Sequence, residues 1–160
     1  MFFRESPPAA PAAPLVVASR APHTPPPPAM PNVTRPHGVI LVVDDSPLIR
    51  SVVSRALQVN NHEVHLAENG RLGLETWERL KDSIQLVVSD VFMPEMDGLT
   101  MAREIRKRNR TVPILIMSSK LDDDTRWVAE EAGFPLLPKP FKDEVLRLLV
   151  DRLLRTPRHA

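Results

Sequence analysis

The sequence predicts an α/β protein built on a doubly wound parallel sheet of five strands. From residue 37 onward, short apolar runs alternate with segments of helical periodicity, which is the pattern of βα units that feed a parallel sheet. The first run ends at Asp44 and Asp45, and the third ends at Asp90. Because ligands of such sheets bind beyond the carboxyl ends of the strands, these acids mark the expected site.

The five strands are expected where apolar and β-branched residues form short runs bounded by turn-forming residues. These runs cover residues 39–43, 63–67, 84–89, 112–117 and 135–138. Right-handed crossovers and five strands favour the order 2-1-3-4-5. That order places the switch point, where a ligand can bind, between the first and third strands.

Five helices are expected from start signals followed by apolar residues at helical spacing. The first begins with Ser46 as N-cap and Pro47 at the first helical position. Polar or acidic residues open the next three helices, the fourth ends at Gly133, and the fifth runs from about residue 142 to 154. The openings of the second, third and fourth helices are Asn69-Gly70, Asp97-Gly98 and Asp122 to Asp124.

Residues 1–36 differ in composition from the rest of the 160-residue chain, since they hold 11 of its 18 prolines. The segment has no helical or alternating pattern, so a disordered tail with polyproline II character is expected. Residues 37–157 are expected to form the folded domain. Because few residues follow the fifth helix, no DNA-binding or enzymatic output domain is expected in this chain.

The composition excludes several classes of function. The chain has no Cys, which rules out disulfides, Cys-based zinc sites and Cys nucleophiles. The tail contributes +2 to the net charge, and residues 37–160 carry 18 basic and 19 acidic side chains, so no nucleic-acid partner is expected. The basic cluster from Arg103 to Arg110 is interpreted as a solvated helix face. No apolar stretch is long enough to span a membrane, and a cytoplasmic protein is expected.

The residues at the strand ends predict a phosphate-handling site. Asp44, Asp45 and Asp90 would crowd three carboxylates together, and oxygen-only ligands favour a hard divalent ion such as Mg²⁺. Ser118 follows the fourth strand and Lys139 follows the fifth. A metal ion, a hydroxyl and a fixed cation around a carboxylate suit phosphoryl transfer to that carboxylate.

Four segments in order resemble the motifs of the two-component response regulator receiver domain. They are Val42 to Ser46, Val88 to Gly98, Ile116 to Ser119 and Lys139 to Phe141. The resemblance covers residues 38 to about 155, and it implies a flavodoxin-like fold of the CheY kind. It also implies a signalling phosphoacceptor rather than an enzyme acting on a separate substrate.

By this resemblance, Asp90 accepts the phosphoryl group from a histidine kinase or a phosphotransfer protein. Asp45 is the direct Mg²⁺ ligand with help from Asp44, and the backbone carbonyl of Phe92 completes the protein ligands. Ser118 is the switch hydroxyl, and Lys139 pairs with the phosphate. The expected partners also include a downstream target protein and a second copy bound through the fourth helix, fifth strand and fifth helix.

The sequence departs from the family pattern near its fifth strand. Leu136 stands where the family usually has an aromatic residue, and Gly133 precedes Lys139 by six residues rather than seven. The chemistry at Asp90 does not depend on these positions, whereas the conformational readout does.

Two alternative functions are weighed against the phosphoacceptor. A non-phosphorylated pseudo-receiver would serve only as an interaction module, and intact Asp45, Asp90 and Lys139 argue against it. A haloacid-dehalogenase-like phosphatase would need Asp-x-Asp after its first strand, and the segment that begins at Asp44 lacks that spacing.

Three further expectations concern surface and core. Leu146, Val150 or Leu154 of the fifth helix is expected to face a partner, because its apolar residues exceed what one buried stripe needs. Trp127 and Phe141 are interpreted as packing residues. His37, His62 and His65 are interpreted as surface or strand-flanking residues.

Overall fold

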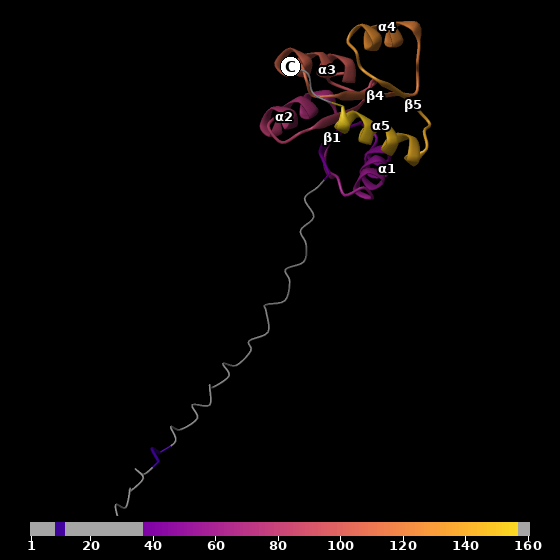
Figure 1. Cartoon of the computed structure of the whole chain (residues 1–160). Coiled ribbons are helices and arrows are strands. Elements are labelled where there is room, and N and C mark those ends of the chain that lie inside the picture. The colour runs from indigo at the N-terminus through magenta and orange to yellow at the C-terminus, as the bar shows by residue number, and fades with distance from the viewer. Residues whose placement is uncertain (1–8, 12–36, 157–160) are drawn as a thin grey trace, which may run out of the picture. The chain divides into compact units, whose positions relative to one another are not determined.

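Strands and helices alternate along the chain in a computed structural model that describes residues 9–11 and 37–156 (Figure 1). The expected disordered tail therefore lies outside the described residues, apart from residues 9–11. The described part contains five strands and five helices. Their order is β1 (Val39–Val43), α1 (Pro47–Gln58), β2 (Glu63–Ala67), α2 (Gly70–Leu80), β3 (Leu86–Asp90), α3 (Gly98–Arg108), β4 (Ile114–Ser118), α4 (Asp123–Glu131), β5 (Leu136–Pro138) and α5 (Asp143–Arg155).

The strands form one parallel sheet in the order β2-β1-β3-β4-β5, which confirms the predicted topology. In the register, Val42 of β1 aligns with Leu66 of β2 on one side and with Val88 of β3 on the other. The order reverses between β1 and β3, so the carboxyl ends of these two strands flank the switch point where ligands of such sheets bind.

The strands β3 and β4 begin two residues later than the sequence predicts. Ile84 and Val112 are apolar and buried, so each extends the apolar run without belonging to the strand. The amide of Ile84 donates to the carbonyl of Leu80 at 2.9 Å, which makes it part of the turn that follows α2. Hydrophobicity reports burial, whereas a strand begins where the ladder of hydrogen bonds begins.

Two hydrophobic clusters cover the two faces of the sheet. Side chains of α1 and α5 pack against one face around Ile40 and Val42. Side chains of α2, α3 and α4 pack against the other face around Leu41 and Val43, with Trp77 among them. Because successive residues of a strand point to opposite faces, β1 supplies both clusters and reads as a continuous apolar run. A central parallel strand is expected to look this way.

The helices begin where the sequence predicts. Ser46, Asn69, Asp97 and Asp122 are the N-caps of α1 to α4, and each side chain accepts a hydrogen bond from the amide three residues later. Such caps typically contribute about 1 kcal/mol each. After α4, Gly133 adopts a φ of +69°, the left-handed conformation that commonly follows a helix end.

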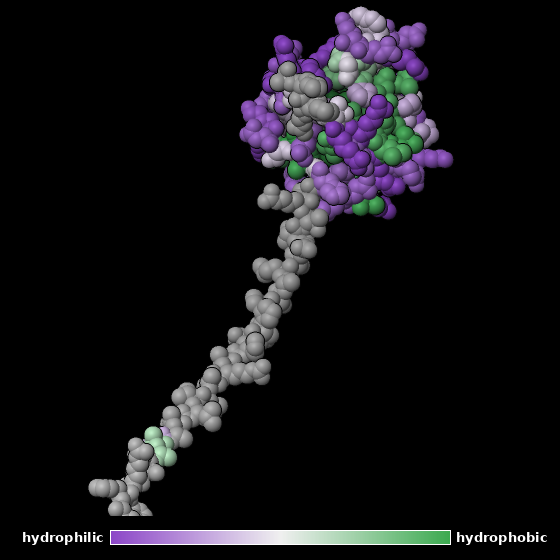
Figure 2. Space-filling view, viewed as in Figure 1, coloured by the Kyte–Doolittle hydropathy of each residue, from purple (hydrophilic) through white to green (hydrophobic). Residues whose placement is uncertain are grey.

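The structure corrects the expected partner surface on α5. Leu146 and Val150 are fully buried against the sheet, and Leu154 is partly buried. The large apolar residues that α5 exposes are Val145 and Leu148, the latter at 70%. The prediction counted apolar residues around the helix, but α5 packs against both the sheet and α1, which covers a wider stripe. Figure 2 shows hydrophobic side chains gathered on the side of the molecule where β5 and α5 lie in Figure 1.

Three other side chains clarify earlier interpretations. Trp127 is 62% exposed, so its interpretation as a packing residue is wrong, whereas Phe141 packs against the cluster beneath α1 and α5. His62 flanks β2 as expected but is buried rather than on the surface, and its Nε2 lies 3.3 Å from Oδ1 of Asp151. Among the described residues, no helix is long and apolar enough to cross a membrane.

Gly98 at the start of α3 fits tightly beneath the end of β3. Its amide donates to the carbonyl of Val91 at 2.8 Å. A Cβ atom built on Gly98 would lie 1.8 Å from the backbone oxygen of Asp90, and this oxygen belongs to a strand that has little freedom to move. The glycine therefore allows α3 to approach the strand end that carries Asp90.

Replacing Gly98 with alanine is expected to destabilise the protein. Forcing a methyl group into a packed interior typically costs about 1–3 kcal/mol, and the backbone overlap here places Gly98→Ala at the upper end of that range. Urea denaturation measures the change. The matched control is Gly38→Ala, whose Cβ would meet side-chain atoms alone, the end of flexible Leu154 at 2.9 Å and Oε1 of Gln85 at 3.4 Å. Equal stability of the two variants would contradict the close approach at Gly98.

Candidate functional site

Three carboxylates converge at the carboxyl edge of the sheet. Asp44 and Asp45 follow β1, and Asp90 is the last residue of β3. Each offers a ligand atom, and these atoms all lie within 4.8 Å of one another. Asp44 and Asp90 are buried, while Asp45 is exposed to solvent. This is the only group of at least three His, Cys, Asp or Glu residues in the described part of the chain that has metal-binding spacing.

Lys139 reaches into this cluster from the end of β5. Its Nζ lies 2.7 Å from Oδ2 of Asp44 and 2.9 Å from Oδ1 of Asp90. The backbone amide of Lys139 donates to the carbonyl of Ser118 at 2.8 Å, which fixes the base of the side chain beside β4. The peptide bond between Lys139 and Pro140 is cis. The lysine thus crosses the edge of the sheet to bridge two carboxylates from different strands.

Burial and charge oppose each other at these groups. The pKa of Asp90 is raised, chiefly by burial. The hydrogen bond and the attraction to Lys139 lower this pKa, and the charges of Asp44 and Asp45 raise it further. For Lys139, burial lowers the pKa, but the hydrogen bonds to Asp44 and Asp90 outweigh it, so the pKa is raised. Lys139 therefore keeps its positive charge. With all three acids ionised, three negative charges and one positive charge leave a surplus that suits a divalent cation.

Hydrogen bonds hold the acidic loop after β1 in place. Oδ1 of Asp44 accepts from the amide of Ser46 at 2.8 Å. Nη1 of Arg50 donates to the carbonyl of Asp44 at 2.7 Å and to that of Asp45 at 3.2 Å. The sequence analysis did not single out Arg50. Its position one turn into a helix that directly follows the two acids is the signal that points to it.

Ser118 is the last residue of β4 and Phe92 lies two residues after the end of β3, and both side chains interact with Lys120. Ser118 is buried, and its hydroxyl donates to the carbonyl of Lys120 at 2.5 Å and accepts from the amide of Lys120 at 3.1 Å. Phe92 is 47% exposed, and Nζ of Lys120 lies 5.8 Å from its ring centroid. Lys120 thus connects the loops that follow β3 and β4.

An apolar groove of about 330 Å³ lies beside the acidic cluster. Lys139 forms part of its wall, so one group belongs to both the groove and the cluster. The other lining residues come from α1 and from the segments that follow β4 and β5, namely Ile49, Val52, Val53, Ser119, Pro140 and Phe141. Leu48 of α1, next to the groove residue Ile49, is 69% exposed.

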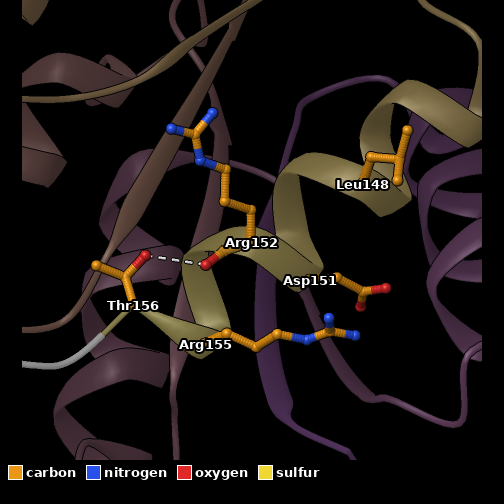
Figure 3. Close-up of a pocket in the computed structure, with 5 residues that line it drawn as sticks. All are labelled: Leu148, Asp151, Arg152, Arg155 and Thr156. Carbon is orange, nitrogen blue, oxygen red and sulfur yellow. Dashed lines mark hydrogen bonds between the residues drawn. The ribbon is translucent and has the colours of Figure 1, made fainter.

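A second hollow, of about 520 Å³, lies on the C-terminal half of α5 (Figure 3). It is lined by Leu148, Asp151, Arg152, Arg155 and Thr156. The hydroxyl of Thr156 donates to the carbonyl of Arg152 at 2.9 Å, closing the end of the helix. Because α5 starts after β5 and runs back along the sheet, this hollow lies away from the acidic cluster and shares no residue with it.

The family model described as the response regulator receiver domain matches residues 40–151. The chain belongs to this family, and it is therefore a receiver domain of the kind found in two-component signalling. The match begins one residue into β1, includes the other four strands and reaches into α5.

Known proteins agree with this assignment. The chain is 39% identical over 116 residues to the sensor kinase CckA of Brucella abortus, covering 72% of this chain and 12% of that protein. It is 38% identical over 117 residues to the response regulator MprA of Mycolicibacterium vanbaalenii, covering 72% and 50%. The chain thus spans half or less of these relatives.

Solved structures show the same fold. The chemotaxis protein CheY4 of Vibrio cholerae matches with a TM-score of 0.67 and 30% identity, covering 72% of this chain and 98% of that one. The receiver domain from the hybrid histidine kinase CckA matches with a TM-score of 0.63 and 33% identity, covering 74% and 100%. The flavodoxin-like architecture of the CheY kind is therefore shown.

Removing the bridging cation is expected to destabilise the metal-free protein. Lys139→Met would leave two buried carboxylates without their ammonium, and we expect a loss of about 1–3 kcal/mol after allowance for the partial exposure of Lys139. Saturating Mg²⁺ should restore much of the loss, because a ligand that binds only the folded state stabilises it. Urea denaturation with EDTA or with Mg²⁺ measures both effects.

The matched control is Lys142→Met, three residues further along and on the surface, with no side-chain capping bond. This substitution should change the free energy of unfolding little in either solution. If Lys139→Met proves as stable as Lys142→Met in EDTA, the bridge contributes nothing to the fold.

Proposed function

We propose that this protein is a phosphoacceptor of a two-component phosphorelay and that Asp90 is its phosphorylated residue. The observation that carries the proposal is the bridge from Lys139 to Asp44 and Asp90 within a cluster of three carboxylates. A carboxylate next to a fixed cation and a metal-binding pair of acids can attack phosphorus while its surroundings neutralise the charge on the phosphoryl oxygens.

In the proposed reaction, an oxygen of Asp90 attacks the phosphorus of a phosphohistidine on the partner. The new O–P bond forms an acyl phosphate, the N–P bond of the donor breaks, and the imidazole leaves with the electron pair. When Lys139 turns from Asp90 toward the phosphoryl group, its ammonium pairs with an equatorial oxygen. The protein then carries the phosphoryl group and acts on no separate substrate.

We assign the metal ligands to Asp44, Asp45, Asp90 and the backbone carbonyl of Phe92. Mg²⁺ fits this set because every donor is oxygen and the acids carry surplus negative charge. When bound, Mg²⁺ supplies positive charge to the transferring phosphoryl group. The bonds from Arg50 to the acidic loop orient these ligands before the ion arrives.

Ser118 is proposed as the switch. Its hydroxyl is bonded to the backbone of Lys120 on both sides, and donation to a phosphoryl oxygen requires the hydroxyl to give up its bond to the Lys120 carbonyl. Phosphorylation would thereby release the start of the loop that leads to α4. This route to α4 does not require an aromatic residue at the position of Leu136, which is half-buried against the core.

The phosphodonor, a histidine kinase or phosphotransfer protein, is proposed to dock in the apolar groove that Lys139 borders. The groove shares Lys139 with the acidic cluster, and exposed Leu48 precedes the groove residue Ile49 in the sequence. A helix lying in the groove could therefore hold its phosphohistidine close to Asp90. A downstream target is proposed to bind α5, where Val145 and Leu148 expose apolar surface.

The remaining assignments follow from this chemistry. The folded domain is proposed to span residues 37–157. A cytoplasmic location is proposed because phosphohistidine donors draw on ATP. The pseudo-receiver alternative, an interaction module without phosphorylation, makes no use of the bridging lysine or of the three converging acids.

Substitution of the acceptor tests the central proposal. Asp90→Asn keeps the size of the side chain but removes the attacking oxyanion, so incorporation of phosphate from acetyl phosphate should fall to background. Phosphate-affinity electrophoresis measures incorporation, and Asp97→Asn, an N-cap in the following loop, is the control that should still be labelled. Labelling of Asp90→Asn at the rate of the unchanged protein would exclude Asp90 as the acceptor. Absence of labelling in the unchanged protein as well would favour the pseudo-receiver.

Docking is tested separately from chemistry. Leu48→Asp places a charge beside the apolar groove, so phosphotransfer from a phosphorylated histidine phosphotransfer protein should slow by about tenfold or more. Labelling by acetyl phosphate, which needs no docking, should not change. The control is Val59→Asp at the other end of α1, where the exposure is also 69%. Equal slowing by both substitutions would show that the groove is not the docking site.

A further inference from the structure

A basic groove of about 580 Å³ lies where α3 ends and the segment between α4 and β5 begins. Its floor is apolar, formed by Ala132 and the buried ring of Phe134. Its rim consists of four basic side chains, Arg103, Arg106, Lys107 and Arg110. The folded part of the chain has nearly balanced charge, so this is a local concentration of positive charge around an apolar surface.

Most of these cations lack a carboxylate partner. Lys107 pairs with Glu104 at 2.5 Å, whereas Arg103, Arg106 and Arg110 make no ion pair with any other described residue. The guanidinium of Arg106 lies 5.3 Å from the ring centroid of Phe134, and its Nη1 donates to the carbonyl of Arg110 at 2.6 Å. Burial lowers the pKa of Arg106, and no acid offsets this effect. An anionic partner would compensate these charges.

The surface of α4 carries the complementary features. Trp127 is 62% exposed on this helix. At positions three and four residues before and after it, and hence on the same face, stand four exposed acids, Asp123, Asp124, Glu130 and Glu131. Within the part of the chain that the structure describes, none of the four forms an ion pair. We call this the acidic face of α4.

The acids in the last turn of α4 do not help their own helix. Glu130 and Glu131 lie near its C-terminus, and α4 has no basic residue in its last turn. The negative end of the helix dipole repels them, so they disfavour the helix by a few tenths of a kcal/mol at an exposed position. Their placement beside an exposed tryptophan is instead suited to contact with a basic, apolar surface on another molecule.

We propose that the acidic face of α4 docks into the basic groove of a second copy of this chain, and that the contact is reciprocal in a two-fold dimer. The groove offers four cations around an apolar floor, and the acidic face offers four anions around one large aromatic side chain. The charges are thus opposite in sign, and each surface has an apolar or aromatic centre. Residues 1–36 carry three arginines and one glutamate, the same sign as the groove, so charge favours a second copy of α4 over this segment.

The arrangement within one molecule allows reciprocity. Ala132 is the C-cap of α4 and also lines the groove, so the acidic face and the groove adjoin each other. A two-fold axis beside this junction places each α4 on the groove of the other copy and makes both contacts at once. This surface of α3 and α4 differs from the surface of α4, β5 and α5 that the family resemblance suggests for self-association. It also requires no phosphoryl group on Asp90.

Charge reversal on the two sides tests the proposal in the full-length protein. The groove variant combines Arg103→Glu with Arg110→Glu, and the helix variant combines Glu130→Lys with Glu131→Lys. Sedimentation velocity over a range of protein concentrations measures the dimer dissociation constant. The unchanged protein should dimerise more weakly as salt rises, and each variant alone should dimerise about tenfold or more weakly.

The decisive measurement is an equal mixture of the two variants. In that mixture, the reversed helix faces the reversed groove, and the unchanged helix faces the unchanged groove, so dimerisation should return to near the level of the unchanged protein. The control variant, Arg55→Glu with Arg79→Glu, reverses two exposed charges on α1 and α2 and should dimerise normally. Circular dichroism checks that every variant is folded. No step of this experiment requires phosphorylation of Asp90.

Three results would overturn the proposal. The first is that the unchanged protein remains a monomer at every concentration in low salt. The second is that the mixture associates no better than either variant alone. The third is that the control weakens dimerisation as much as the groove variant does, which would point to net charge rather than to this contact.

Discussion

The ammonium group of Lys139 between Asp44 and Asp90 is the interaction on which the functional end of this protein depends. It joins the ends of β1, β3 and β5, which are far apart in the sequence. Without a cation, three neighbouring carboxylates repel one another, and two of them are buried, where charge is costly. The lysine offsets part of this repulsion and leaves a negative surplus for a metal ion. Structural stability and the proposed chemistry therefore rest on the same contacts.

The packing around this bridge explains why it is held firmly. Gly98 permits α3 to begin directly beneath the end of β3, and Arg50 ties the loop after β1 to α1. In contrast, the hydroxyl of Ser118 is bonded to the backbone of Lys120 within its own loop. In the proposed function, the charged groups stay fixed and this one hydroxyl changes its bonding partner, which is the kind of local change that biases a switch.

The surface is divided into areas of different chemistry. The groove beside Lys139 is apolar and adjoins the acids, α5 exposes Val145 and Leu148, and α3 with α4 carries segregated charges around Phe134 and Trp127. We propose a different partner for each area: a phosphodonor for the apolar groove, a downstream target for α5, and a second copy of the chain for α3 and α4. Because the areas lie on different elements, the contacts can be altered one at a time.

The sequence was enough to predict the sheet order, the helix starts and the residues of the acidic cluster. Strand ends, N-caps such as Asp97 and the motifs around Asp44 and Asp90 are local signals, and local chemistry decides them. It also predicted the residue that supplies the cation. The sequence could not show that Leu146 is buried while Trp127 is exposed. The identity of an apolar residue is the same whether its side chain is buried or exposed. Which side of a helix is covered depends on how distant elements pack, and the bonds of Arg50 and Ser118 depend on the conformation of their loops. These features follow from the three-dimensional arrangement of the chain and not from local signals.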